Sequence, residues 1–237
     1  MEIIQKDNRL DNLSNSKKVL KAFIIASVFL GLIWCVKLID VYFIHYPLYK
    51  FGILPRTVVG FSGVILAPFL HSDASWDHII SNSLPAFLLL FFTFYWYRII
   101  ATKVLVWIWL MTGTWVWLIA PSGTYHIGAS GIVYGLAAFL FTSGIVRRNK
   151  SALAISLLVA FLYGSLFWGI FPLQYHVSWQ SHLFGAFAGV VIAFYYKKSD
   201  VFSSNEYKWE RDENESSISF TYNLSKEDVT YEYKERK

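Results

Sequence analysis

Charged side chains are scarce in this sequence. Asp, Glu, Lys and Arg make up 16% of the 237 residues, whereas hydrophobic residues make up 55% and aromatic residues 19%. A soluble domain usually contains about 25% charged residues, so this composition argues against a chain that folds in water. It favours a protein whose solvent is a lipid bilayer.

Cysteine is nearly absent as well, since Cys35 in the first apolar run is the single example. One cysteine excludes an intramolecular disulfide, and its surroundings predict a small residue that faces lipid or a neighbouring helix. The N-terminus begins Met-Glu-Ile-Ile-Gln-Lys-Asp, which is too polar for a signal peptide, and the apolar run after it is too long. We therefore expect no cleaved signal sequence.

The charges that are present are unevenly distributed. Residues 1–199 carry fifteen Lys or Arg and six Asp or Glu, whereas residues 200–237 carry six and ten, so a basic body precedes an acidic tail. The basic residues lie beside apolar segments and form no continuous stripe, which indicates membrane topology and no nucleic-acid partner.

The sequence contains six apolar segments close to the length of about 20 residues that a membrane-spanning helix needs. They are residues 19–44, 78–97, 103–120, 129–146, 151–171 and 180–196. Residues 45–77 are apolar but interrupted by proline and glycine, which predicts a first outer loop that dips into the membrane. The predicted fold class is an all-α polytopic membrane protein with a six-helix bundle. It comprises a cytoplasmic segment 1–18, a membrane domain 19–197 and a charged tail 198–237, disordered or a weak hairpin.

Basic residues occupy alternate loops. They precede the first span, separate the second from the third and the fourth from the fifth, and follow the sixth. The opposite loops, residues 121–128 and 172–179, carry no charge. The positive-inside rule therefore predicts that both termini are cytoplasmic and that the uncharged loops lie on the outer side.

A serine at the start of the fourth span is the first candidate for chemistry. Ser130 lies in Gly128-Ala129-Ser130-Gly131, and the free backbone N–H groups of a helix start can stabilise negative charge. At about 1.5 Å per residue, it lies roughly 25 Å from Arg147, slightly below the outer surface of a hydrocarbon core about 30 Å thick. Taken alone, Gly131 and Gly135 favour a helix-packing site instead, because they form a GxxxG pair.

A histidine at the start of the sixth span alters that balance. His182 shares one helical face with Gly185, Gly189 and Ala193, and small residues let another helix approach closely. Packing of the fourth and sixth spans would bring Ser130 and His182 to the same depth. A neutral imidazole within hydrogen-bond reach can take the serine proton. An ionisable side chain inside a membrane is also costly enough to indicate function.

A second polar pair begins the second span. His78 and Asn82 are four residues apart, so they point to the same face of a helix, again at its outer end. Both can donate hydrogen bonds to an oxyanion, a role worth about 3–4 kcal/mol per donor. The alternative interpretation is a pair of polar caps at the membrane interface.

These three motifs together resemble the rhomboid family of intramembrane serine proteases, over about residues 20–197. The matching residues are His78 and Asn82, then Gly128, Ala129, Ser130, Gly131 and Tyr134, then His182, Gly185 and Gly189. The resemblance implies a catalytic dyad of Ser130 and His182, with Tyr134 packed on the His182 ring. It implies that His78, Asn82 and the Ser130 amide surround the oxyanion, with the motif glycines in support.

The resemblance further implies a six-span core of prokaryotic type in the cell (inner) membrane, with transmembrane protein substrates and no cofactor or metal. Water must reach such a site, so we expect a polar cavity open to the outer side, lined by Ser81, Asn82, Ser130, Gln180 and Ser181. Entry of a substrate should require movement of the fifth span and of the loop 172–179.

Two features depart from the usual family pattern. The later spans contain no Asp or Glu, so a third, carboxylate member of a triad has no candidate and a dyad remains. Many family members carry a Trp-Arg pair in the first outer loop, where this chain has Gly52-Ile-Leu-Pro55-Arg56.

Two other functions stay open. A membrane metalloprotein would use His45, His71, His126 and His176 near the outer side, but their spacing matches no standard ligand set. A non-catalytic rhomboid-like protein would bind membrane-protein clients. The joint presence of Ser130, His182, His78 and Asn82 argues against that function, because an inactive relative has no chemical need for all four.

Overall fold

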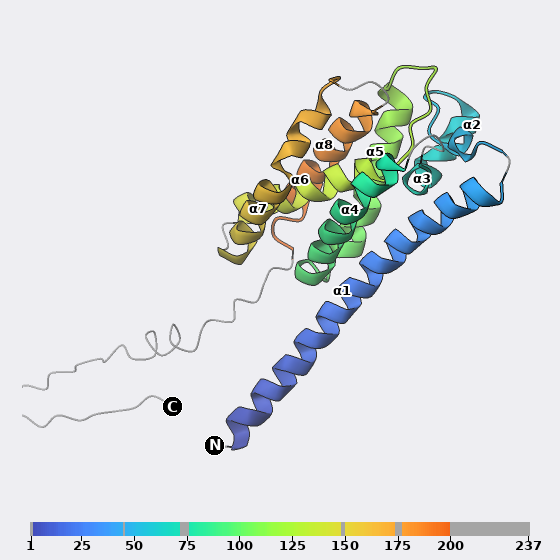
Figure 1. Ribbon diagram of the computed structural model, residues 1–237. Helices are drawn as coiled ribbons and strands as arrows, with labels where there is room; N and C mark the ends of the chain where they lie inside the picture. The colour runs from blue at the N-terminus through green and yellow to red at the C-terminus, as the bar shows by residue number, and fades with distance from the viewer. Residues whose placement is uncertain (1, 45, 72–75, 148–149, 174–176, 200–237) are drawn as a thin grey trace, which may run out of the picture. The chain divides into compact units, whose positions relative to one another are not determined.

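The computed structural model (Figure 1) describes residues 2–44, 46–71, 76–147, 150–173 and 177–199. Side chains are described from residue 15 onward, except those of residues 150 and 151. Almost all of the predicted tail 198–237 lies outside this part of the chain, as do His45 and His176.

Six long helices form the described structure. They are α1 (Glu2–Tyr42), α4 (Asp77–Trp96), α5 (Ala101–Ile119), α6 (Ser130–Arg147), α7 (Lys150–Tyr163) and α8 (Trp179–Tyr195). Short helices fill the connection between α1 and α4, namely η1 (Leu48–Phe51), α2 (Val58–Phe61), α3 (Gly63–Leu66) and η2 (Ala67–Phe69). A 3₁₀ segment, η3 (Gly164–Ile170), continues α7. The predicted all-α polytopic fold is confirmed.

Five segments are long and apolar enough to cross a membrane: Asn15–Tyr42, Asp77–Trp96, Ala101–Ile119, Ser130–Arg147 and Ala152–Ile170. The sixth predicted segment corresponds to α8, which has 17 residues and is not among the five. Its first turn contains Gln180, Ser181 and His182, and the helix is one residue shorter than Ser130–Arg147, the shortest of the five.

Helix α6 is the centre of the bundle. It packs against α4, α5, α7 and α8, while α1 packs against α4 (Figure 1). In α6, 61% of the most apolar stretch is buried inside the protein, compared with 17% in the segment Ala152–Ile170. The α7 segment therefore forms the periphery, and α6 carries its first residue, Ser130, into the interior.

Glycines allow α6 and α8 to approach backbone to backbone. A methyl group on Gly185 would overlap the carbonyl oxygen of Gly131, and one on Gly189 would overlap that of Gly135. Lipid supplies no hydrophobic force between helices, so this close approach, with its many van der Waals contacts, is what holds the pair together.

The segment between α1 and α4 is anchored to α5. Trp109 Nε1 donates to the Val64 carbonyl at 3.0 Å, and Trp117 Nε1 donates to the Thr57 carbonyl at 2.9 Å. Arg56 donates to the Ala120 carbonyl at 2.7 Å, which satisfies one of the unpaired carbonyls at the end of α5. Arg56, the last residue of the stretch Gly52-Ile-Leu-Pro55-Arg56, thus has a structural role in this loop.

The opposite end of the bundle is held by a second arginine. Arg147, the last residue of α6, donates to the carbonyls of Tyr196 at 2.7 Å and Ser199 at 2.8 Å, just beyond α8. Its guanidinium also lies over the ring of Tyr97, 5.0 Å from the centroid. A cation at a helix C-terminus is favourable for both the free carbonyls and the helix dipole.

Substitution of Gly189 tests the α6–α8 contact. Gly189→Ala should destabilise the detergent-solubilised protein by about 1–3 kcal/mol, because the methyl group forces the helices apart. Thermal unfolding measures the change. Gly31→Ala is the matched control, since no atom lies within 4 Å of its added Cβ. Equal melting temperatures for the two variants would show that the contact is not tight.

Candidate active site

Ser130 is placed by the sharp turn that enters α6. Gly128 has φ +104°, a conformation that side chains disfavour, and its N–H donates to the Ala67 carbonyl at 2.8 Å. The first helical hydrogen bonds run from Ile132 and Val133 to the Ala129 carbonyl, at 3.0 and 3.1 Å. The Ser130 amide therefore precedes the hydrogen-bonded ladder and stays available for an anion. The side chain is buried, with 8% of its surface exposed.

His182 lies in the first turn of α8, and one face of its imidazole ring is packed against another side chain. Tyr134 of α6 stacks on the imidazole, with ring centroids 4.0 Å apart and planes 7° from parallel. The residue is buried, with 7% of its surface exposed. Ser178 caps this end of α8 by accepting from the Ser181 amide at 3.3 Å. The histidine is thereby fixed by its own helix and by α6.

The edge of the same ring is fixed by a third element. Nδ1 of His182 lies 2.9 Å from the carbonyl oxygen of Gly169 in η3. A carbonyl oxygen can only accept a hydrogen bond, so Nδ1 carries the proton. In the neutral ring, Nε2 is then the basic nitrogen.

The glycine contact brings the two predicted dyad residues to the same end of the helix pair. Gly131, whose carbonyl contacts Gly185, directly follows Ser130, and His182 precedes Gly185 by three residues, about one turn. In the described part of the chain, the side chains of Ser130 and His182 form no hydrogen bond with each other. Such bonds are often long in enzymes without substrate.

His78 and Asn82 of α4 lie beside the turn that precedes Ser130. A Cβ on Gly128 would be 2.6 Å from His78 Nε2, so the imidazole is in direct contact with this turn. Asn82 is buried, and its Nδ2 donates to the His78 carbonyl at 2.9 Å. An amide nitrogen has two hydrogens, which leaves a second donor on Asn82.

Two further histidines pack at this end of the bundle, and their spacing in the sequence does not predict their contacts. His71 is buried with its ring edge-on to His78, 5.0 Å between centroids. His126, in the loop before Ser130, lies with Nδ1 2.6 Å from the hydroxyl of Ser178, the cap of α8. His126 thereby connects the loop that carries Ser130 to the helix that carries His182.

The alternative role for these histidines was metal binding. Among the residues that the structure describes, no group of three or more His, Cys, Asp or Glu side chains is placed to hold a metal ion. The contacts of His71 and His126 are with a neighbouring imidazole and a hydroxyl. Both fit a structural role.

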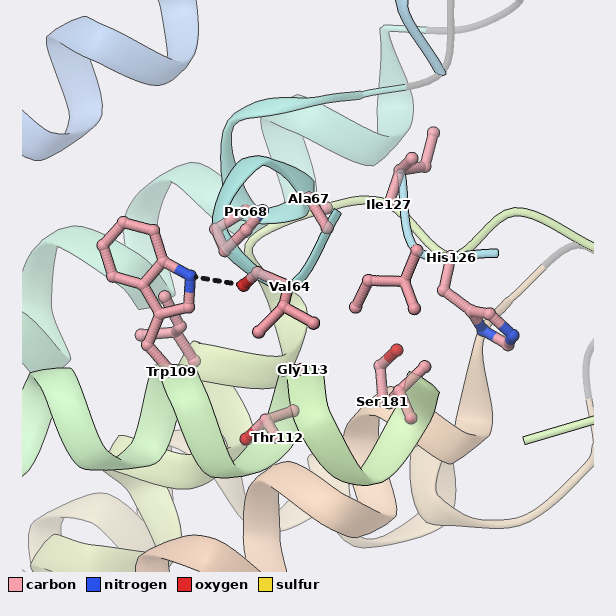
Figure 2. A pocket seen from close by; sticks show the side chains of 14 residues that line it. Val64, Ala67, Pro68, Trp109, Thr112, Gly113, His126, Ile127 and Ser181 are labelled. Carbon is pink, nitrogen blue, oxygen red and sulfur yellow. Dashed lines mark hydrogen bonds between the residues drawn. The ribbon is translucent and has the colours of Figure 1, made fainter. Parts of the chain in front are cut away.

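A small cavity lies next to the site (Figure 2). Its volume is about 30 Å³, and it is bounded by Val64 of α3, by Thr112 and Gly113 of α5, and by His126 and Ser181. This volume suffices for a water molecule. Of the five residues expected to line an outward-open cavity, only Ser181 lines this one.

The sequence model of the rhomboid domain matches residues 60–199, which include α4 to α8 and every candidate site residue. The chain belongs to the rhomboid family. An uncharacterized protein of Mycobacterium tuberculosis is 38% identical over 151 residues, 60% of this chain and 62% of that protein. One from Mycobacterium bovis gives the same values.

An uncharacterized protein of Mycobacterium leprae is 36% identical to this rhomboid over 178 residues, 70% of this chain and 68% of the relative. The alignment with the M. tuberculosis and M. bovis proteins spans 62% of their length, less than two thirds. No solved structure matches the chain.

The loop histidines should make the stability of this rhomboid depend on pH. Burial lowers the pKa of His126 to about 4, whereas an unfolded histidine has a pKa of about 6.5. Below pH 6.5 the unfolded chain therefore binds the proton more readily, and stability falls as the pH drops toward 4. The slope is at most about 1.4 kcal/mol per pH unit for one histidine.

Thermal unfolding between pH 8 and pH 4.5 measures this effect. His126→Asn, which can still bond Ser178, should reduce the slope without removing it, because burial and the adjacent His78 lower the pKa of His71 to about 3. Identical pH profiles for the variant and the wild type would contradict this account of His126.

Proposed function

We propose that this rhomboid is an intramembrane serine endopeptidase that hydrolyses peptide bonds in or near the transmembrane segments of other membrane proteins. The observation that carries the proposal is the buried His182 imidazole. It is stacked on Tyr134 and bonded at Nδ1, so that Nε2 is its basic atom, at the end of the α6–α8 contact where Ser130 begins α6. A nucleophile, a base and a group that orients the base are the components of acyl-transfer catalysis.

In the proposed reaction, Ser130 Oγ attacks the carbonyl carbon of the scissile bond while His182 Nε2 takes the hydroxyl proton. The tetrahedral intermediate collapses, the C–N bond breaks, and His182 gives the proton to the leaving amine. A water molecule, deprotonated by His182, then attacks the acyl ester; the bond to Ser130 Oγ breaks, and His182 returns the proton to that oxygen. The enzyme ends in its starting protonation state.

Negative charge that develops on the carbonyl oxygen needs donors. The Ser130 amide, which precedes the helical ladder, the second N–H of Asn82 and the imidazole of His78 against Gly128 are the available groups. They come from the starts of α6 and α4 and are already held in place before substrate binds. Preorganised donors of this kind are effective because they need no rearrangement in the transition state.

The distribution of basic residues supports a defined orientation for this reaction. Arg147, Lys197 and Lys198 lie at the end of the α6–α8 pair that is opposite Ser130. Basic ends face the cytoplasm, so both termini are cytoplasmic and the site lies toward the outer side. The relatives are bacterial proteins, which supports a place in a bacterial cell membrane.

Labelling with a fluorophosphonate tests the proposal. This probe phosphonylates activated serines with loss of fluoride, so the purified wild type should become labelled, while Ser130→Ala and His182→Ala should not. Ser62→Ala is the control, because Ser62 is exposed between α2 and α3 and its hydroxyl donates to the nearby Val59 carbonyl. Melting curves show whether each variant is folded.

A folded wild type without label, or equal labelling of Ser130→Ala, refutes the serine-protease proposal. The non-catalytic rhomboid-like function, binding of membrane-protein clients, then becomes the leading one.

The oxyanion donors give a separate prediction. Asn82→Ala and His78→Ala should each lower the labelling rate constant by about 10- to 1000-fold, since the phosphonyl oxygen also gains negative charge. Ile80→Ala on the same turn, where the side chain is exposed, should label like the wild type. Unchanged rates for both polar variants would remove α4 from the catalytic site.

A further inference from the structure

We propose that the backbone carbonyl of Gly169 orients His182 for catalysis, in the position that a carboxylate occupies in a triad. This inference rests on the proposed function. No Asp or Glu occurs between Asp77 and Asp200 in the sequence, so no acidic side chain of the later helices can hold the imidazole. The ring is nevertheless bonded at Nδ1, by a peptide group of η3.

The orientation follows from two contacts that act together. Stacking on Tyr134, with planes 7° from parallel, fixes the plane of the imidazole but permits a flip of about 180° around the Cβ–Cγ bond, which would exchange Nδ1 and Cδ2. The 2.9 Å hydrogen bond from Nδ1 to Gly169 fixes the remaining freedom and selects the tautomer. Nε2 thus keeps its lone pair, which general-base catalysis requires.

Glycine is required at position 169 for this contact. A Cβ there would overlap the hydroxyl of Tyr134 and would lie 2.9 Å from Tyr134 Cζ and 3.2 Å from His182 Nδ1. The backbone of η3 therefore touches both rings at once. Any side chain would move the carbonyl away from the imidazole or separate the two rings.

The element that carries this carbonyl is peripheral. The segment Ala152–Ile170 has the lowest buried share among the five candidate spans, 17%, and none of the residues of η3 is fully buried. A 3₁₀ helix of seven residues also exceeds the usual length of three or four. Displacement of η3 would break the bond to His182, so the base is oriented only while η3 packs against α8.

Alanine substitutions within η3 test the role of Gly169. Gly169→Ala should lower the fluorophosphonate labelling rate at least tenfold, because the carbonyl can no longer reach Nδ1. Gly164→Ala is the matched control, since it lies in the same 3₁₀ segment and its added Cβ meets no atom within 4 Å. It should stay within twofold of the wild type. Melting curves exclude loss of the fold.

A double variant separates this steric cause from general damage. Tyr134→Phe removes the hydroxyl that the new methyl group overlaps. Gly169→Ala should therefore lower the labelling rate by a smaller factor in the Tyr134→Phe background than in the wild type, each variant being compared with its own parent. Equal fold-losses in the two backgrounds would mean that the methyl group does not act through the Tyr134 hydroxyl.

Nitrogen-15 NMR of histidine-labelled protein reads the orientation directly, with His182→Ala used to assign the signals. The neutral His182 ring should carry its proton on Nδ1 in the wild type and in Gly164→Ala, and lose that preference in Gly169→Ala. A proton on Nε2 in the wild type, or a Gly169→Ala variant that labels normally, overturns the inference. If labelling depends on Ser130 and His182 but not on Gly169, the proposed function stands and the inference alone fails.

Discussion

Contact between the backbones of α6 and α8 is the constraint on which the rest of the site depends. Because Gly131 and Gly135 meet Gly185 and Gly189 without side chains between them, the two helices start at the same end of the bundle with their first turns adjacent. Separate contacts hold the two ends of this helix pair. Arg147 does this at one end, and the link from His126 through Ser178 to Ser181 does it at the other.

The remaining elements contact or support this helix pair. Helix α4 brings His78 and Asn82 to the turn at Gly128, η3 brings a carbonyl to His182, and the segment before α4 is anchored on α5 by Trp109 and Trp117. These groups come from α4 and η3, so the proposed chemistry would depend on helix packing and not on one contiguous motif. A buried base whose partner is a neutral carbonyl gains less electrostatic help than one beside a carboxylate, so such a site depends more on accurate orientation.

The helix bounds and the α6–α8 contact could be predicted from the sequence, because the length of apolar segments and the spacing of small residues are local features of the chain. The spans at residues 78–97, 103–120 and 129–146 match α4, α5 and α6 closely. Other features could not be read. The Gly169 carbonyl leaves no trace in a side-chain pattern, because every residue has one, and its role comes from the path of η3 after α7. His126 contacts the hydroxyl of Ser178, 52 residues later in the sequence. Arg56 donates to the Ala120 carbonyl at the end of α5. Such long-range partners depend on tertiary structure that spacing does not encode.

The glycine contact also has a thermal consequence. When soluble domains unfold, apolar groups enter water, and the resulting rise in heat capacity curves their stability with temperature. Helices that separate within a bilayer exchange one apolar neighbour for another, so little of that heat-capacity change arises. Dispersion forces, which vary little with temperature, then maintain the register of α6 with α8. The same register sets the relative depth of Ser130 and His182.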